Sequence, residues 1–184
     1  DAHTRAERLA QVQALLERST LAGSPVMEVS AVRGDGVDDL RKRLLQQAAT
    51  PATDATQVQG FRMALDRVFT LDGIGTVVAG SVAAGEVRVG DALCLAHDPG
   101  RTYRVRSLHS HGQALESART GQRCAVGLTG LERGAVQRGQ TLCDAAIAHD
   151  SLRLDVWLQV AATEDKPLRS GTQVHLHLGT QEVM

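Results

Sequence analysis

The spacing of apolar residues changes once along the chain. Between Arg5 and Arg18, apolar residues recur at three- and four-residue steps with charged residues on the other side, which predicts an amphipathic helix. Residues 26–29 predict a short strand, and residues 37–45 predict a second helix. This order of elements is typical of a parallel α/β sheet. Because one strand cannot form a sheet, we expect residues 1–49 to be the C-terminal remnant of a larger α/β domain.

The remainder of the chain has the pattern of a β protein. Residues 50–60 are rich in Thr, Ala, Pro and Gln without apolar periodicity, which predicts a linker. From 61 to 147, short runs rich in Val and Leu alternate with glycine turns, which predicts a small antiparallel barrel. Strict alternation of apolar and polar residues predicts two further strands, at 152–160 and 174–178. The expected fold is therefore mainly β, with residues 148–184 beginning a second, incomplete β-barrel.

Composition narrows the class of protein. Hydrophobic residues make up 42% of the chain and charged residues 22%, as in soluble globular proteins, and no apolar run approaches the roughly 20 residues that cross a bilayer. The first residues carry neither a start methionine nor a secretory signal, so they resemble a cut end. The cysteines, three in number and far apart, fit neither a disulfide framework nor a closed zinc site. We expect a cytoplasmic protein without a membrane partner.

Charge and aromatic content limit how the chain can bind nucleic acid. The net charge is −1, so any such affinity must come from local basic patches. Aromatic residues are only 2% of the chain, which argues against stacking platforms for single strands. Four arginines of the predicted barrel are compatible with either a patch for tRNA phosphates or solvated charges on its exterior. They are Arg101, Arg104, Arg106 and Arg119.

One loop carries a possible ligand motif. Residues 30–40 read Ser-Ala-Val-Arg-Gly-Asp-Gly-Val-Asp-Asp-Leu and lie between a predicted strand and a predicted helix, where backbone amides can bind a ligand. On physical grounds alone, an ordinary βα loop is favoured. The loop resembles, however, the Ser-Ala signature that closes the guanine pocket of the GTPase superfamily. This resemblance implies that Ser30 and Ala31 bind guanine through the Ala31 amide.

The barrel carries a second, more specific resemblance. Four segments, in this order, resemble domain 2 of elongation factor Tu and its relatives. They are residues 61–70, 73–80, 85–91 and 120–123. Within this family, Asp66-Arg67, the Gly-Gln-Arg that ends at Arg123, and the His-Leu-His at 175–177 are similar to the bacterial selenocysteine-specific elongation factors. The resemblance runs from about residue 26 to the end and implies the tail of a G domain, a complete domain 2 and the start of domain 3.

The resemblance implies a parent GTPase that binds GTP with Mg²⁺ and delivers selenocysteinyl-tRNA to the ribosome. The barrel would contribute the aminoacyl pocket, lined by Asp66, Arg67 and Arg123, with Thr76 and His111 as further contacts for the tRNA end or the amino acid. A messenger-RNA hairpin would be a partner only through a C-terminal region that this chain lacks. The Gly-x-x-x-x-Gly-Lys-Ser/Thr loop, the magnesium switches and the Asn-Lys-x-Asp motif are absent from the sequence. We therefore expect no catalytic residue, cofactor or metal here, and no GTP hydrolysis.

Arg67 also stands out without the resemblance. Strict alternation places it on the apolar face with Phe61, Met63 and Leu65, where an unpaired charge is costly. Either a β-bulge turns Arg67 outward, or the charge is functional. A selenol is more acidic than a thiol or an alcohol, so selenocysteine is largely anionic at neutral pH, whereas serine is neutral. Two guanidiniums, those of Arg67 and Arg123, would distinguish the two amino acids.

Alternatives remain open from the sequence. The chain is also compatible with another translational GTPase, such as elongation factor Tu or an initiation factor, although Asp66-Arg67 in place of an acidic pair argues against the former. A β-barrel interaction module without a tRNA ligand would not need Arg67 and Arg123 to lie together. The pairs His109/His111 and His175/His177 have metal-ligand spacing but no Cys or acidic partner at a matching position, which favours an exposed strand face.

Overall fold

The computed structural model describes residues 2–49, 60–161, 164 and 166–184. The chain divides into two compact units. One contains Asp1–Ala52 and Asp155–Thr172, and the other contains Thr53–Leu154 and Gln173–Met184. The predicted linker at 50–60 lies, except for Gly60, outside the described residues.

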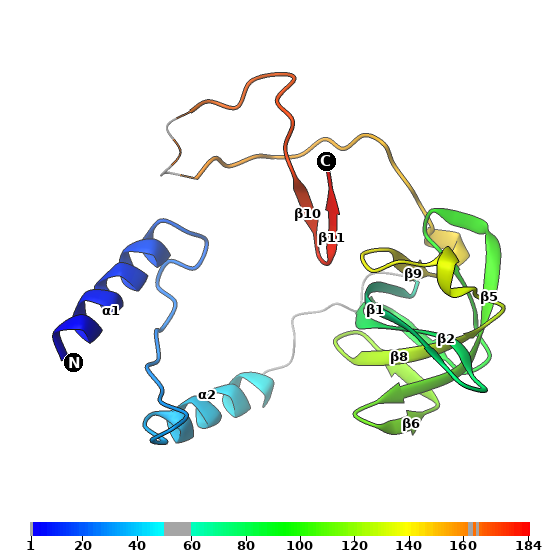
Figure 1. Cartoon of the computed structure of the whole chain (residues 1–184), viewed down its shortest axis with the longest axis horizontal. Coiled ribbons are helices and arrows are strands. Elements are labelled where there is room, and N and C mark those ends of the chain that lie inside the picture. Colours follow the sequence, from blue (N-terminus) through cyan, green and yellow to red (C-terminus); the bar gives the residue numbers. More distant parts are fainter. Residues whose placement is uncertain (1, 50–59, 162–163, 165) are drawn as a thin grey trace. The chain divides into compact units, whose positions relative to one another are not determined.

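The first unit contains two helices, α1 (Ala2–Glu17) and α2 (Val37–Ala49) (Figure 1). Both predicted helices are therefore confirmed. The predicted strand at 26–29 is wrong, because these residues are irregular. A strand needs a neighbour to satisfy its backbone hydrogen bonds, and in the described part of this unit none is present. The helices likewise leave apolar side chains in solvent, and Leu15 is 68% exposed.

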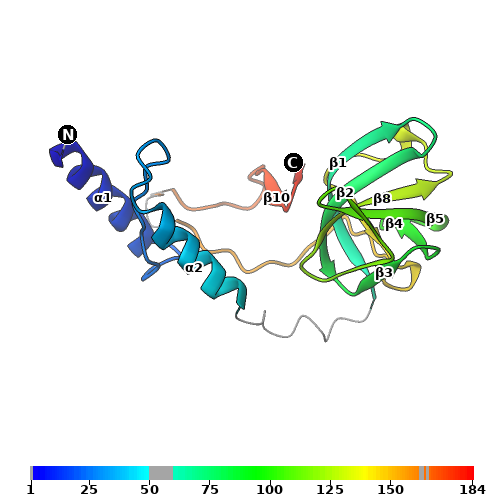
Figure 2. The ribbon, with the colours of Figure 1, turned by 90° about the horizontal axis from the view of Figure 1, so that it is seen from below.

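The second unit is built around an antiparallel barrel (Figure 2). Its strands are β1 (Arg62–Leu71), β2 (Gly75–Ala84), β3 (Glu86–Arg88), β4 (Ala92–Leu95), β5 (Asp98–Ser110), β6 (Gln113–Leu115), β7 (Ser117–Arg119), β8 (Arg123–Thr129) and β9 (Thr141–Cys143). In the described residues six strands follow the order β4-β9-β1-β2-β8-β5, and a further β4–β5 pairing closes the sheet. Strand β6 pairs antiparallel with the end of β5, and β3 pairs with β7. The mainly β fold with a small antiparallel barrel, expected from the sequence, is confirmed.

The interior of the barrel is filled by side chains from every strand that closes it. The largest fully buried residues are Phe61, Met63, Leu65, Leu93, Leu95, Leu108, Leu128, Leu142, Val78, Val87, Val105 and Val126. Met63 and Leu65, Leu93 and Leu95, and Val126 and Leu128 follow the period of two of their strands. Val105 and Leu108 are three residues apart because the register of β5 shifts between Val105 and Ser107. Strands β1 and β2 approach closely at Gly80, where a Cβ atom would lie 2.0 Å from the carbonyl oxygen of Ala64. Two short 3₁₀ helices, Arg133–Ala135 and Ala145–Ile147, flank β9.

The chain after the barrel differs from the sequence expectation. Residues 152–160 are irregular and exposed, so the strand predicted there is wrong. Alternation identifies a face suited to burial, but no described strand pairs with this segment. The second predicted strand is confirmed in part as β10 (Leu176–Leu178), which forms a hairpin with β11 (Gln181–Val183). No described helix has the length and apolar character needed to cross a bilayer.

Candidate functional site

A β-bulge in β1 determines how Asp66 and Arg67 are presented. Leu65 pairs with Gly80 and Arg67 with the adjacent Ala79, so Asp66 is an extra residue on β1. The bulge shifts the phase of the alternation, because Leu65 is fully buried whereas Arg67 is exposed. The conflict seen in the sequence is thus resolved by an outward turn of the charge.

Asp66 forms a bidentate ion pair with Arg123 at the start of β8. Arg123 donates from Nη2 to Oδ1 of Asp66 at 2.7 Å and from Nε to Oδ2 at 3.1 Å. The carboxylate raises the pKa of the Arg123 guanidinium through this hydrogen bond and its charge. The side chains are 49% exposed for Arg123 and 28% for Asp66, so the pair faces solvent. The strand order places β2 between the two residues, so the ion pair spans β2.

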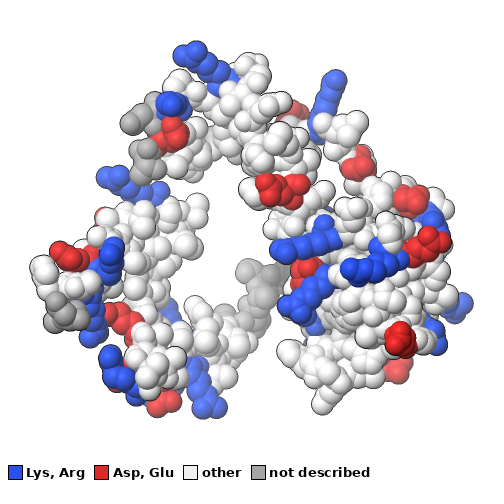
Figure 3. All heavy atoms as spheres, viewed as in Figure 1, with Lys and Arg blue, Asp and Glu red and all other residues white. Residues whose placement is uncertain are grey.

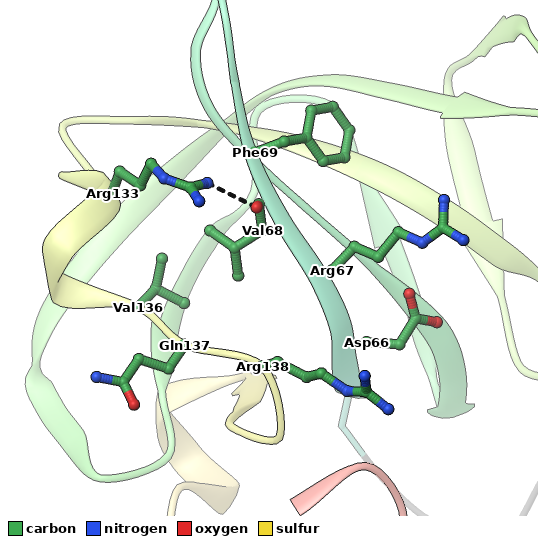
Figure 4. Close-up of a pocket in the computed structure, with 8 residues that line it drawn as sticks. All are labelled: Asp66, Arg67, Val68, Phe69, Arg133, Val136, Gln137 and Arg138. Atoms are coloured by element: carbon green, nitrogen blue, oxygen red, sulfur yellow. Dashed lines mark hydrogen bonds between the residues drawn. The ribbon is translucent and has the colours of Figure 1, made fainter.

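A pocket of about 760 Å³ lies beside this bulge (Figure 4). One wall comes from β1 and the other from the segment between β8 and β9. Its lining residues are Asp66, Arg67, Val68, Phe69, Arg133, Val136, Gln137 and Arg138. Arg133 donates from Nη1 to the carbonyl oxygen of Val68 at 2.7 Å and so links the two walls. The pocket therefore combines an apolar floor with a charged rim.

The rim of this pocket is cationic. It carries the guanidiniums of Arg67, Arg133 and Arg138 against the one carboxylate of Asp66. Among the described residues, no carboxylate pairs with Arg67 or Arg138, whereas Asp66 is already engaged by Arg123. Figure 3 shows basic side chains gathered on the face of the barrel that carries β1 and β9. Such a rim favours an anionic ligand.

The structure brings together part of the predicted aminoacyl site. Asp66 and Arg67 line the pocket, and Arg123 is joined to it through Asp66. Thr76 and His111 do not line it. Thr76 is only 4% exposed and pairs with Thr70, and His111 lies in the β5–β6 turn with a φ of +50°.

Sequence reasoning missed Arg133 and Arg138. Both lie in irregular or 3₁₀ structure between strands, where apolar periodicity carries no signal about which way a side chain points. The Gly139 turn that follows Arg138 was the one available indication. Arg104 and Arg106, in contrast, lie exposed on β5 and do not line the pocket.

The Ser-Ala loop adopts a compact turn in the first unit. The Ser30 amide donates to the carbonyl oxygen of Asp35 at 2.9 Å, and the Gly34 amide donates to that of Ser30 at 2.7 Å. Gly36 must be glycine, because a Cβ atom would lie 2.3 Å from the carbonyl oxygen of Glu28. Within the described residues no acceptor takes the Ala31 amide, and Ala31 is exposed.

One of the paired histidines has an acidic neighbour. Nδ1 of His175 lies 2.6 Å from Oε1 of Glu182 across the β10–β11 hairpin. In the part of the chain that the structure describes, His, Cys, Asp and Glu side chains nowhere gather in a group of three that could hold a metal ion.

Comparisons with known proteins identify relatives that share the barrel. Residues 75–143 match the family described as elongation factor Tu domain 2. The chain is 37% identical over 174 residues to a selenocysteine-specific elongation factor of Desulfomicrobium baculatum, with 95% of this chain and 27% of the relative covered. The selenocysteine-specific elongation factor of Escherichia coli is 34% identical over 174 residues, with coverages of 94% and 27%. The chain thus spans about a quarter of the length of these relatives.

Solved structures give a similar result. The crystal structure of a bacterial selenocysteine-specific elongation factor, EF-Sec, matches with a TM-score of 0.67 and 28% identity over 77% of this chain and 24% of that one. The apo form of translation elongation factor SelB from Methanococcus maripaludis matches with a TM-score of 0.65 and 27% identity, over 77% and 30% of the two chains. Sequence and fold therefore lead to the same group of proteins.

Proposed function

We propose that this chain is part of a GTPase that delivers selenocysteinyl-tRNA to the ribosome. The chain is a relative of the selenocysteine-specific elongation factors and contains an elongation factor Tu domain 2. In this proposal the barrel contributes the pocket for the aminoacyl group. Ser30 and Ala31 contribute the edge of the guanine site, with the amide of Ala31 as the donor to the base. GTP phosphates and Mg²⁺ are held by parts of the protein outside this chain, and the protein acts in the cytoplasm.

The observation that carries the proposal is the uncompensated charge of Arg67 at the pocket. Asp66 neutralises Arg123 in a bidentate pair, so the group of Asp66, Arg67 and Arg123 retains one net positive charge. A selenocysteine side chain is largely anionic at neutral pH and could accept a hydrogen bond from Arg67. Serine is neutral and would leave the cation without an anion.

The magnitude of this discrimination follows from the number of available cations. A hydrogen bond to a charged group contributes about 1.5–3 kcal/mol, or roughly 10- to 100-fold in affinity. The sequence suggested two free guanidiniums, but Arg123 is already held by Asp66. We therefore assign the direct contact to Arg67, and to Asp66 the role of orienting Arg123 beside it. Arg138 on the opposite wall adds to the positive field.

The test is a tRNA-protection assay on the full-length protein with selenocysteinyl-tRNA and seryl-tRNA. Arg67→Ala should reduce the preference for selenocysteinyl-tRNA by about tenfold or more. Arg106→Ala is the matched control, because it removes an exposed arginine from β5, away from the pocket, and should leave the preference unchanged. Equal weakening of both tRNAs by Arg67→Ala would contradict the proposal and favour a barrel that binds tRNA without selecting its amino acid.

A further inference from the structure

The bulge that presents Asp66 and Arg67 is held at the carbonyl of the preceding residue, Leu65. That oxygen accepts two hydrogen bonds, from the Gly139 amide at 2.8 Å and from the Thr180 hydroxyl at 2.8 Å. The Leu65 amide in turn donates to the carbonyl oxygen of Gln140 at 2.9 Å. Both backbone groups of Leu65 are thus engaged on the side of β1 away from β2.

Thr180 reaches this carbonyl from the turn of the β10–β11 hairpin, which lies far along the chain. The same turn packs against Gly139, where a Cβ atom would lie 2.8 Å from both Cα and Cβ of Gln181. Gly139 also has a φ of +93°, so two independent constraints require glycine there. Figure 4 includes part of the hairpin, in pale red, at its lower edge below Arg138. The turn therefore contacts residues adjoining both walls of the pocket.

We propose that Thr180 is a positioning residue of the pocket: its hydroxyl fixes the Leu65 carbonyl and thereby the bulge that carries Asp66 and Arg67. The physical reason is that a bulge interrupts the regular ladder, so its backbone depends on other partners to hold one conformation. The carbonyl of Leu65 and the amide of Asp66 belong to the same peptide plane. Rotation of that plane would move Asp66, and with it the ion pair to Arg123, and would change the direction in which Arg67 points.

The inference rests on the proposed function only in its binding readout. Thr180→Val keeps the side-chain shape but removes the hydroxyl, whereas Thr180→Ser keeps the hydroxyl. Thr129→Val is the matched control, because Thr129 is exposed on β8 and its hydroxyl has no described partner. In the full-length protein, hydrogen exchange is measured at the amides of Leu65 and Gly139, together with affinity for selenocysteinyl-tRNA.

Thr180→Val should speed exchange at both amides and weaken binding by about two- to tenfold, the effect of one hydrogen bond. Thr180→Ser should restore both values, and Thr129→Val should change neither. Unchanged exchange at Leu65 and Gly139 would overturn the proposal. An equal rise at Val126, in the interior of β8, would also overturn it, because the loss would then be one of general stability.

Arg67→Ala separates this inference from the proposed function. If Arg67→Ala weakens binding while Thr180→Val leaves it unchanged, Thr180 does not position the pocket and the inference is wrong. If Arg67→Ala leaves binding unchanged, the proposed function is wrong, and local exchange alone decides whether Thr180 holds the bulge.

Discussion

Gly80 is the residue at which the smallest change should do the most damage to the barrel. In Gly80→Ala, the new Cβ atom would lie 2.0 Å from the carbonyl oxygen of Ala64 and 3.0 Å from its carbonyl carbon. Real Cβ contacts are not shorter than 3.0 Å, so β1 and β2 must separate by 3.0 − 2.0 = 1.0 Å. The obstacle is backbone rather than a flexible side chain, and it lies between two fully buried residues, Met63 and Leu65.

Overpacking of a close-packed core costs typically 1–3 kcal/mol, and a backbone clash of this size belongs at the upper end, at about 3 kcal/mol. For a domain of this size, such a loss lowers the melting temperature by about 10–20 °C. Thermal unfolding followed by far-ultraviolet circular dichroism measures the shift. Because Gly80 pairs with Leu65 at the bulge, the same variant should also disturb the pocket.

Gly134→Ala is the matched control for this prediction. No atom lies within 4 Å of its Cβ position, and its φ is not positive, so the change should stay within about 0.5 kcal/mol. If Gly80→Ala were as stable as Gly134→Ala, the two strands would not approach as closely as described. The assignment of the bulge to Asp66 would then lose its support.

Two further predictions concern the ion pair and the thiols. Asp66→Asn should lower the free energy of unfolding by less than about 1 kcal/mol, because the ion pair with Arg123 faces solvent. Urea unfolding measures this change. A larger loss would mean that the ion pair stabilises the barrel. Burial raises the pKa of the Cys143 thiol to about 12. Its contribution to stability should therefore be complete below the pKa of a thiol in the unfolded chain and should be lost as the pH rises from there to about 12. Cys143→Ser should flatten this part of the pH dependence of the unfolding free energy, and an unchanged slope would contradict the burial argument.

The parts that sequence predicted well are those that carry their own periodicity. The helices and the barrel appear where three- to four-residue or two-residue spacing is clear. The segments at 26–29 and 152–160 show why a local apolar pattern is insufficient, because it reports which side chains suit burial but not whether a neighbouring strand is there to pair with. In both segments the structure has no such neighbour among the described residues.

In the candidate site, too, some features could be predicted from the sequence and others could not. The misplaced charge at Arg67 was readable, because it broke the alternation of β1, and the bulge was one of its two explanations. Its ion-pair geometry was not readable, because Asp66 and Arg123 meet across an intervening strand. Arg138 and Thr180 belong to turns, whose contacts depend on the tertiary fold rather than on local pattern. The contact between the bulge and the distant hairpin can therefore be recognised only from the three-dimensional structure.

Recognition of an anionic side chain by Arg67 can be measured with cysteine on the same tRNA. A thiol has a pKa of about 8.5, so cysteine changes from neutral to anionic between pH 7 and pH 9 without a change of shape. With an amide-linked aminoacyl-tRNA that resists hydrolysis, the full-length protein should bind the cysteine form about tenfold more tightly at pH 9 than at pH 7. The serine form, and the Arg67→Ala variant with either form, should show no such rise. A cysteine affinity that is the same at both pH values would mean that Arg67 does not recognise an anionic side chain.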